Sequence, residues 1–298
     1  MQSVAKHDGQ VNDASQPSFS RPLANGVRGS DGPLLLTDSQ PIPMNKNLIF
    51  AIAGLLAVPA ALHAQEFKSK FGKDRKIVID MQGSDVTVEG YDGLELVIRG
   101  NGFEPAPKRA EGLRAVYNTA VDNTNLGVAV TEEGGTVRIT RATRKDATYT
   151  IRVPHSTAVQ YNQTNWNGGD LQVRDVNGHL EVNMKTGDMK LLNVAGPVVA
   201  NSVSGDITIR YAPLRQGPSS ISAVSGDVDM TMPASTKATL KLRSISGEIY
   251  TDFDLTLPKP QGDMRHIGGQ VVDGSVNGGG TVLSLKAIIG DIYVRKAK

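Results

Sequence analysis

The sequence predicts an all-β protein, a single-domain β-solenoid (β-helix) with coils of 18–21 residues that follows an N-terminal signal peptide. Three observations lead to this fold class. Gly-Asp pairs recur at regular intervals, and apolar residues alternate with polar ones between them. Glycine is also abundant (32 of 298 residues), while aromatic residues are scarce (5%). Short alternating strands joined by glycine turns give this composition, whereas a helical bundle does not.

Charge and cysteine content exclude several classes of protein. The net charge is only +2, so the chain lacks the concentrated basic face that nucleic-acid binding needs. Cysteine is absent, which excludes disulfides, thiolate nucleophiles, thiolate metal sites and a lipoprotein anchor. An exported chain of this kind must be stabilised by its core and its backbone hydrogen bonds alone.

The first 64 residues are expected to lie outside the fold. Residues 1–43 are rich in Ser, Gln, Gly, Asp and Pro and have no apolar period, which predicts disorder or an upstream extension before a true start at Met44. Residues 44–64 read as a signal peptide, with a basic start, an apolar run and Ala64 at the cleavage point. The apolar run is shorter than the ~20 residues of a membrane span, although an uncleaved anchor is the alternative.

Gly-Asp or Gly-Glu pairs mark the repeat. Their spacings are 18, 18, 21, 21 and 43 residues, and the last spacing equals about two repeats. An apolar residue follows each acid, as Ile207 follows Asp206. Regular repeats are therefore expected over 165–251 and 286–298, with a loop-rich insert over 258–280. The pairs are Gly169-Asp170, Gly187-Asp188, Gly205-Asp206, Gly226-Asp227, Gly247-Glu248 and Gly290-Asp291.

Stacking of these repeats explains their pattern. A strand with period-two alternation buries one face, and a single repeat cannot bury that face alone. Coils stacked ~4.8 Å apart pair every backbone group and build a continuous core. We expect each Gly to supply a positive φ at a corner, and each acid, with the adjacent Ser or Thr, to bond nearby amides of the turn. The repeat residues are therefore predicted to be structural turns.

Asn165, Asn183 and Asn201 stand five residues before the acids of the first three pairs. We expect them in one column, where stacked side-chain amides form a ladder. Calcium binding is the alternative, because calcium β-rolls use a nonapeptide and 18 is twice nine. Only one acid per coil recurs at a fixed place, however, and a calcium cage needs more oxygen ligands. The sequence predicts no metal site and no cofactor.

The first half predicts less regular coils or an N-terminal cap, which a solenoid needs at an exposed edge. Gly83-Ser84-Asp85 is interpreted as a displaced version of the repeat turn. Composition does not change between the halves, so 65–298 is expected to be one β-solenoid domain. Alternating strands are expected at 76–80, 85–88, 94–98, 127–130, 136–140, 149–153 and 157–161.

These features resemble a known family. The opening strand Gly83-Ser84-Asp85-Val86-Thr87-Val88, the strand 149–154 and the serial Ser-Gly-Asp turns ending in 290–296 are similar to the putative-adhesin family of bacterial β-strand-repeat proteins, common in Bacteroidetes-type bacteria. The resemblance covers roughly 75–298 and implies a β-helical, exported protein without catalytic residues. The insert at 252–285 departs from the pattern, and so do Arg243 and Lys286, which occupy the column where earlier repeats have Asn.

The resulting functional prediction is an exported cell-envelope protein, an adhesin that presents a binding surface and performs no catalysis. The expected location is the periplasm, the outer-membrane surface or the medium. Its expected partner is a protein or glycan, with no nucleic acid and no stable membrane span after signal cleavage. The alternatives are a polysaccharide lyase or hydrolase, and a purely structural envelope component.

Few residues are candidates for catalysis, metal binding or ligand binding. The histidines lack ligand-spaced partners, so no catalytic or metal residue is predicted. A glycan-active enzyme would break the repeat, and the only visible break is 258–280, which contains Asp263, Arg265, His266 and Asp273. Trp166, the single tryptophan, is expected either to form a small sugar-stacking patch with Tyr161 or to cap the core.

Overall fold

The computed structural model describes residues 65–298, except 73–74, 105–106, 114–115, 117–119, 146 and 258–269. In this part of the chain the secondary structure consists of twenty strands and one short 3₁₀ helix, η1 (Lys108–Ala110), which confirms the all-β class. All described residues fall in one compact unit. The predicted extension over 1–43 and the predicted signal peptide over 44–64, including Ala64, lie outside the described residues.

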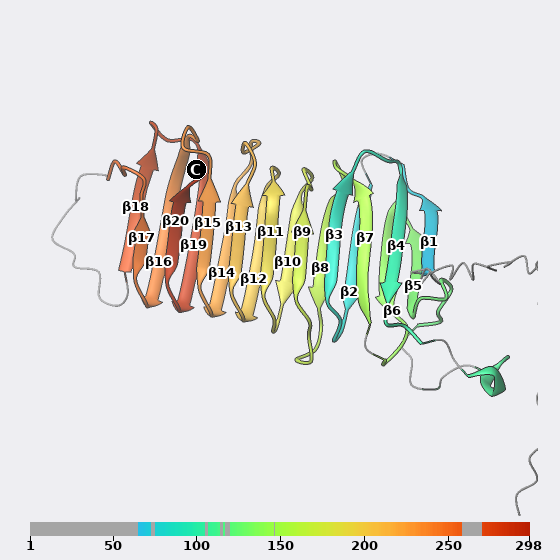
Figure 1. The fold of residues 1–298 in the computed structure, drawn as a ribbon. Coiled ribbons are helices and arrows are strands. Elements are labelled where there is room, and N and C mark those ends of the chain that lie inside the picture. Colours follow the sequence, from blue (N-terminus) through green and yellow to red (C-terminus); the bar gives the residue numbers. More distant parts are fainter. Residues whose placement is uncertain are drawn as a thin grey trace, which may run out of the picture. The chain divides into compact units, whose positions relative to one another are not determined.

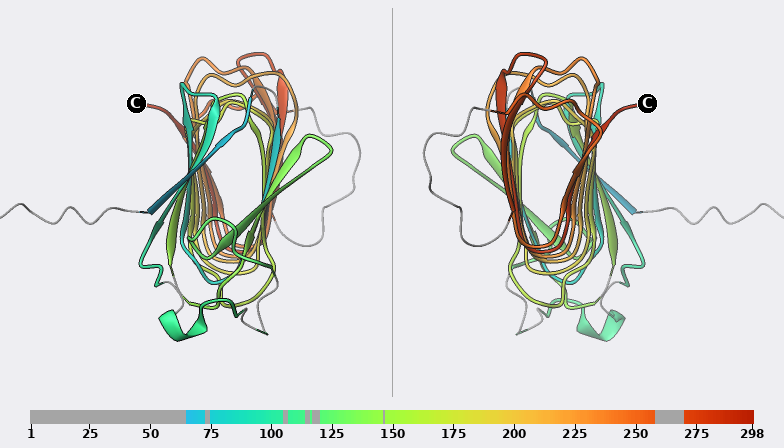
Figure 2. Two further views of the ribbon diagram at one scale, coloured as in Figure 1. Left: turned by 90° about the vertical axis from the view of Figure 1, so that its right-hand side faces the viewer. Right: turned by 90° about the vertical axis from the view of Figure 1, so that its left-hand side faces the viewer.

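The strands form two ten-stranded sheets that face each other (Figures 1 and 2). The first sheet has the order β1 (Gln65–Lys70), β4 (Glu95–Asn101), β7 (Thr148–Pro154), β3 (Val86–Tyr91), β9 (Leu171–Arg174), β11 (Met189–Val194), β13 (Ile207–Tyr211), β15 (Val228–Met232), β20 (Ile292–Lys296) and β17 (Ile249–Thr251). The second sheet has the order β18 (Gln270–Val276), β16 (Ala238–Ser246), β19 (Thr281–Ile289), β14 (Ser219–Ser225), β12 (Val198–Ser204), β10 (Leu180–Met184), β8 (Ala158–Gln163), β2 (Lys76–Met81), β6 (Thr136–Arg141) and β5 (Val128–Glu133).

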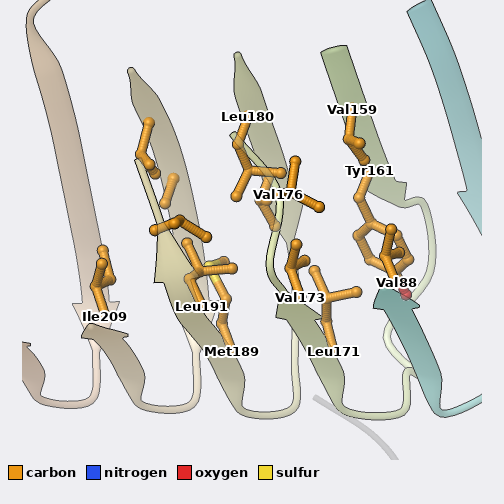
Figure 3. Close-up of a cluster of buried hydrophobic side chains, with 14 of the residues drawn as sticks. Val88, Val159, Tyr161, Leu171, Val173, Val176, Leu180, Met189, Leu191 and Ile209 are labelled. Carbon is orange, nitrogen blue, oxygen red and sulfur yellow. The ribbon is translucent and has the colours of Figure 1, made fainter. Parts of the chain in front are cut away.

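Sequence alternation places the core between the two sheets. In β10, Leu180, Val182 and Met184 are buried, while the residues between them are partly exposed. Strands from successive repeats pair in parallel and in register, so Met189 lies between Leu171 and Ile207. Figure 3 shows the resulting interior, in which aliphatic side chains of neighbouring coils stack on one another. Burial of this apolar surface is the main stabilising contribution to the fold.

The order of strands in space follows the order in sequence only in the middle of the unit. From β8 to β15, each coil, meaning one strand from each sheet, lies beside the next. The pair β19 and β20, however, lies between the pair β14 and β15 and the pair β16 and β17. The 43-residue gap after Gly247 is therefore not a stack of two further coils.

A matching insertion occurs near the other end. The pair β2 and β3 lies between the pair β6 and β7 and the pair β8 and β9. Beyond it, β4 pairs antiparallel with β7, β1 pairs antiparallel with β4, and β5 pairs antiparallel with β6. This change of strand direction distinguishes the first half of the unit from its regular parallel middle.

The predicted loop-rich insert over 258–280 needs correction, because 270–276 forms strand β18, antiparallel to β16. Thr256 forms an isolated bridge to Ser275, and Phe253 is buried against the core. Antiparallel pairing gives β18 a place beside the last regular strand, which the search for Gly-Asp repeats could not detect. Residues 258–269 lie outside the described part of the chain.

Candidate functional site

The repeated acids form a continuous hydrogen-bonded column, which we call the acid ladder. In each step, the Oδ1 atom of one Asp accepts a hydrogen bond from the backbone amide of the acid in the next coil. The order is Asp85, Asp170, Asp188, Asp206, Asp227, Asp291 and Glu248, and the N–O distances are 3.0, 2.9, 3.1, 2.8, 2.8 and 2.8 Å.

The acid ladder links coils and does not close individual turns. We expected each acid to bond an amide of its own turn, but the carboxylates reach the neighbouring coil. The carbonyl of Asp188 in addition accepts from the amide of Leu171 at 2.9 Å, and each further step repeats this backbone bond. Bonds to an ionised acceptor are stronger than neutral ones. The column therefore adds charge-assisted bonds to the backbone pairing of one sheet.

Glu248 is the one glutamate among the aspartates of the acid ladder, and it stands at the end of the column. Among the described residues no further coil follows it in the first sheet, where β17 is the edge strand. Its side chain accepts a hydrogen bond from the side chain of Gln270 instead. A longer acid is therefore compatible with this position, whereas each internal position needs the short reach of Asp.

The glycine of each pair is required by close packing at the corner. At Gly205, φ is +125°, and a Cβ atom there would overlap the carbonyl oxygen of Gly187. Gly226, Gly247 and Gly290 show the same combination of positive φ and contact with the glycine of the neighbouring coil, whereas Gly169 lacks the expected positive φ and is required only by close contact with Ser84 and Asp85. Glycine alone tolerates both conditions.

The predicted asparagine ladder is present, but Asn162 takes the place expected for Asn165. Asn201 donates to Asn183 at 2.9 Å, and Asn183 donates to Asn162 at 3.3 Å, not to Asn165. Asn162 in turn donates to Asp80 at 2.9 Å. The prediction for Asn165 was wrong because Asn162 and Gly169 are seven residues apart, whereas Asn183 and Gly187 are four apart. Three additional residues therefore lengthen this one loop.

The lengthened loop, residues 164–168, is held in place from both sides. The buried side chain of Gln163 donates to the carbonyl of Gly169 at 3.1 Å and accepts from the amides of Lys185 and Thr186 at 3.0 and 2.8 Å. Lys185 Nζ also donates to the carbonyl of Thr164 at 2.7 Å. These bonds hold both ends of the loop on the neighbouring coil.

A pocket of about 480 Å³ lies beside this loop, where the acid ladder begins. Its lining residues lie at or next to the ends of strands β4, β7, β3 and β9, and Figure 1 shows these strands side by side. Thr148 stands beyond Asp85 in this column and offers a hydroxyl in place of a carboxylate. We call this cavity the ladder-head pocket. Its lining residues are Gly83, Ser84, Asp85, Asn101, Gly102, Ala147, Thr148, Asn167, Gly168 and Gly169.

The solvent exposure of Trp166 and of Tyr161 differs from the prediction. Trp166 is 65% exposed, so it does not cap the core, and Lys185 Nζ lies 5.7 Å from the centre of its ring. Tyr161 is fully buried and cannot share a surface patch with Trp166. Burial raises the pKa of the Tyr161 hydroxyl well above its usual range, because the charged form would lose its hydration.

An aromatic pair that was not predicted from the sequence lies at the opposite end of the first sheet. The rings of Tyr250 and Tyr293 stack at 5.3 Å with an interplanar angle of 12°, and the Arg295 guanidinium lies 4.9 Å from the Tyr293 ring centre. Both tyrosines stand two residues after the acid of their pair, which is the signal that could have placed them in one column.

The described residues offer little to the enzyme alternative. They contain no group of three or more His, Cys, Asp or Glu side chains that could hold a metal ion. Asp273 lies in β18 opposite Lys241, while Asp263, Arg265 and His266 lie outside the described part. His155 is half-buried, and its Nδ1 atom lies 2.6 Å from the Asp175 carbonyl. Within the same ranges, no helix is long and apolar enough to cross a membrane.

The fold and the repeat together define a solenoid-like, all-β repeat protein. The family model for Toastrack DUF4097 matches residues 79–294, and the chain belongs to this family. Among curated proteins, none matches the chain.

Two solved structures align with this chain at low similarity. A putative cell adhesion protein from Clostridium sporogenes ATCC 15579 aligns with a TM-score of 0.42 and 10% identity, over 78% of this chain and 99% of that chain. A putative adhesin from Bacteroides fragilis NCTC 9343 aligns with a TM-score of 0.36 and 13% identity, over 77% of this chain and 95% of that chain.

Proposed function

We propose that this chain is an exported, non-catalytic binding protein of the adhesin type, which presents a β-solenoid surface to a partner outside the cytoplasm. In this proposal residues 44–64 direct export and are removed after Ala64. The mature protein is then a solenoid of 18–21-residue coils in its regular part. Its location is the periplasm, the outer-membrane surface or the medium.

One observation carries the proposal: the repeated carboxylates are engaged in holding coils together. General acid–base catalysis needs a carboxyl group within reach of a substrate proton. Here the Oδ1 atoms of Asp170, Asp188 and Asp206 accept the amides of neighbouring coils. The repeat therefore serves as a scaffold, and its irregular loops are the places that can vary for recognition.

Export is tested by expressing the full chain in a bacterial host and sequencing the N-terminus of the purified product. The proposal expects processed protein in the periplasm or medium, starting at Gln65. Protein that keeps residues 44–64 and stays in the cytoplasm would contradict the export part of the proposal.

Binding is tested by coating surfaces with the purified full chain and counting adherent bacterial and host cells. We expect saturable adhesion that soluble protein competes away. A matched incubation with polysaccharides monitors product release. Release of oligosaccharides would favour the lyase or hydrolase alternative, and failure to bind any surface would favour a purely structural role.

A further inference from the structure

We infer that the ladder-head pocket is a binding site for a neutral sugar ring of a saccharide. This inference rests on the proposed function, because it names the chemistry of the partner. It starts from an asymmetry in the repeat: one loop, residues 164–168, is three residues longer than its equivalent in the next coil, and a pocket lies beside it.

The lining of the pocket indicates the class of ligand. Besides glycine backbone, the pocket is lined by short polar side chains of Ser84, Asn101, Thr148 and Asn167. Hydroxyl and carboxamide groups both donate and accept hydrogen bonds, as the hydroxyls of a sugar do. Ala147 is the one apolar side chain of the lining, so a hydrophobic ligand would gain little from burial here.

Charge favours a neutral ligand over an anionic one. Asp85 is the single charged residue among the ten that line the pocket, and its carboxylate would repel a phosphate, sulfate or uronate group. Arg141 Nη1 lies 2.9 Å from the position that a Cβ atom of Gly83 would occupy, but this side chain is 8% exposed and donates to the carbonyl of Lys145 at 2.6 Å. It therefore does not present a cation to the opening.

Ser84 supplies independent evidence for a ligand. This lining residue is only 4% exposed, and its Oγ atom is buried without a hydrogen-bond partner among the described residues. An unpaired buried hydroxyl destabilises a protein, so such groups call for an explanation. Because the Oγ atom is itself shielded from solvent, a sugar hydroxyl in the pocket becomes its partner when the Ser84 side chain rotates toward the opening.

Trp166 supplies an exposed aromatic surface in the same loop as the lining residue Asn167. It precedes Asn167, a lining residue, and 65% of its surface is exposed. An indole combines a large apolar face with a polar N–H group, and the apolar C–H face of a sugar ring can pack on it. Gln82 Nε2 donates to Thr164 Oγ1 at 2.9 Å, so the loop is held before any ligand arrives. Preorganisation of this kind lowers the entropic cost of binding.

The single tryptophan makes the inference directly measurable. The purified full chain is titrated with cello-, chito-, manno- and xylohexaose as neutral probes and with hexagalacturonate as the acidic probe, while Trp166 fluorescence is followed. We expect at least one neutral probe to bind saturably, to shift the emission to shorter wavelength and to protect it from iodide quenching. Preference for hexagalacturonate, or no response to any neutral probe, would overturn the inference.

Variants separate binding from stability. Asn167→Ala and Ser84→Ala are expected to weaken saccharide binding at least tenfold in calorimetric titrations, whereas the distant control Tyr250→Ala leaves it unchanged. Removal of the unpaired Ser84 hydroxyl should leave the melting temperature equal or higher. Unchanged affinity in Asn167→Ala, with native circular dichroism, would show that the pocket is not the site.

The same variants distinguish this inference from the proposed function. If Asn167→Ala and the parent chain adhere equally to cells and neither binds a neutral hexasaccharide, the adhesive function holds and the sugar site is wrong. If a neutral hexasaccharide binds at Trp166 but no cell surface is recognised, the sugar site holds and the adhesive function is wrong.

Discussion

The middle of the solenoid and its two ends make the same hydrogen bonds with different chain orders. Between Asp170 and Asp227 the acid ladder advances by 18 or 21 residues at each step. At the ends, one step spans 85 residues from Asp85 to Asp170, another spans 64 residues from Asp227 to Asp291, and the last spans 43 residues. The bond lengths nevertheless remain between 2.8 and 3.1 Å.

The acid ladder therefore joins acids of coils that are adjacent in space, whatever the number of residues between them in the sequence. In a simple solenoid, each terminal coil contacts one neighbour and can fray from the end. Here the C-terminal strands β19 and β20 each have a neighbour on both sides. The end of the chain is thereby built into the interior of the stack.

The largest effect is expected from removing the inserted coil. Deletion of 281–298 removes β19, which lies between β14 and β16, and β20, which lies between β15 and β17. Both flanking pairs of strands then lose the hydrogen-bonded partner that joins them. We expect loss of cooperative unfolding and exposure of the apolar interior, measured by circular dichroism and dye binding. A stable, cooperative product would show that β16 and β17 can move directly onto the regular part.

A smaller but still large loss is expected at a ladder corner. Gly205→Ala forces a Cβ atom against the Gly187 carbonyl at a φ of +125° and should lower the free energy of unfolding by about 3 kcal/mol. The control is Gly278→Ala, where φ is +85° but no atom lies within 4 Å of the added Cβ, and about 1 kcal/mol is expected. Equal losses in urea unfolding would contradict the packing explanation.

Removal of a carboxylate should lower the free energy of unfolding more in the middle of the acid ladder than at its end. Asp206→Ala leaves the Asp227 amide without its acceptor and should cost about 2 kcal/mol in urea unfolding. Glu248→Ala removes only a side-chain contact to Gln270, and less than about 0.5 kcal/mol is expected. A Glu248 variant as damaging as the Asp206 variant would mean that the ladder has no defined end.

The smallest effect is shared by both regions and depends on pH. Burial raises the pKa of Tyr149, in the first half, and of Tyr211, in the regular part, to about 12. In the unfolded chain a tyrosine hydroxyl ionises near pH 10. The free energy of unfolding is therefore unaffected by these groups below pH 10 and falls as the pH rises from 10 to 12. We expect a loss of about 1 kcal/mol per tyrosine at pH 11. Tyr211→Phe should remove its share, and an unchanged pH profile in that variant would refute the assignment.

Much of the fold was predictable because it depends on local patterns. Period-two alternation located the strands, such as 149–153, and glycine next to an acid located the corners. Gly83-Ser84-Asp85 was correctly related to the repeat turn, since Asp85 begins the acid ladder. The strand order at the ends was not predictable, because a coil of β19 and β20 has the same alternation whichever neighbours it joins.

The candidate site was less predictable than the fold. Aligning Asn165 by its distance from Gly169 concealed the three additional residues that form the loop beside the pocket. Trp166 stood out by type, but the sequence did not reveal that Asn101 and Thr148 lie across the same pocket. Those residues meet there because β7 lies between β4 and β3 in the sheet, which is a consequence of the non-sequential strand order.

The most direct test of the central claim is disulfide crosslinking across the outer face of the second sheet, in a chain that has no native cysteine. Lys286 pairs with Ser222 on one side and with Arg243 on the other. The inserted C-terminal coil predicts oxidation of the pairs Ser222→Cys with Lys286→Cys and Lys286→Cys with Arg243→Cys, because paired strands lie within disulfide reach. It predicts no crosslink between Ser222→Cys and Arg243→Cys, and rapid formation of that bond would contradict the inserted C-terminal coil.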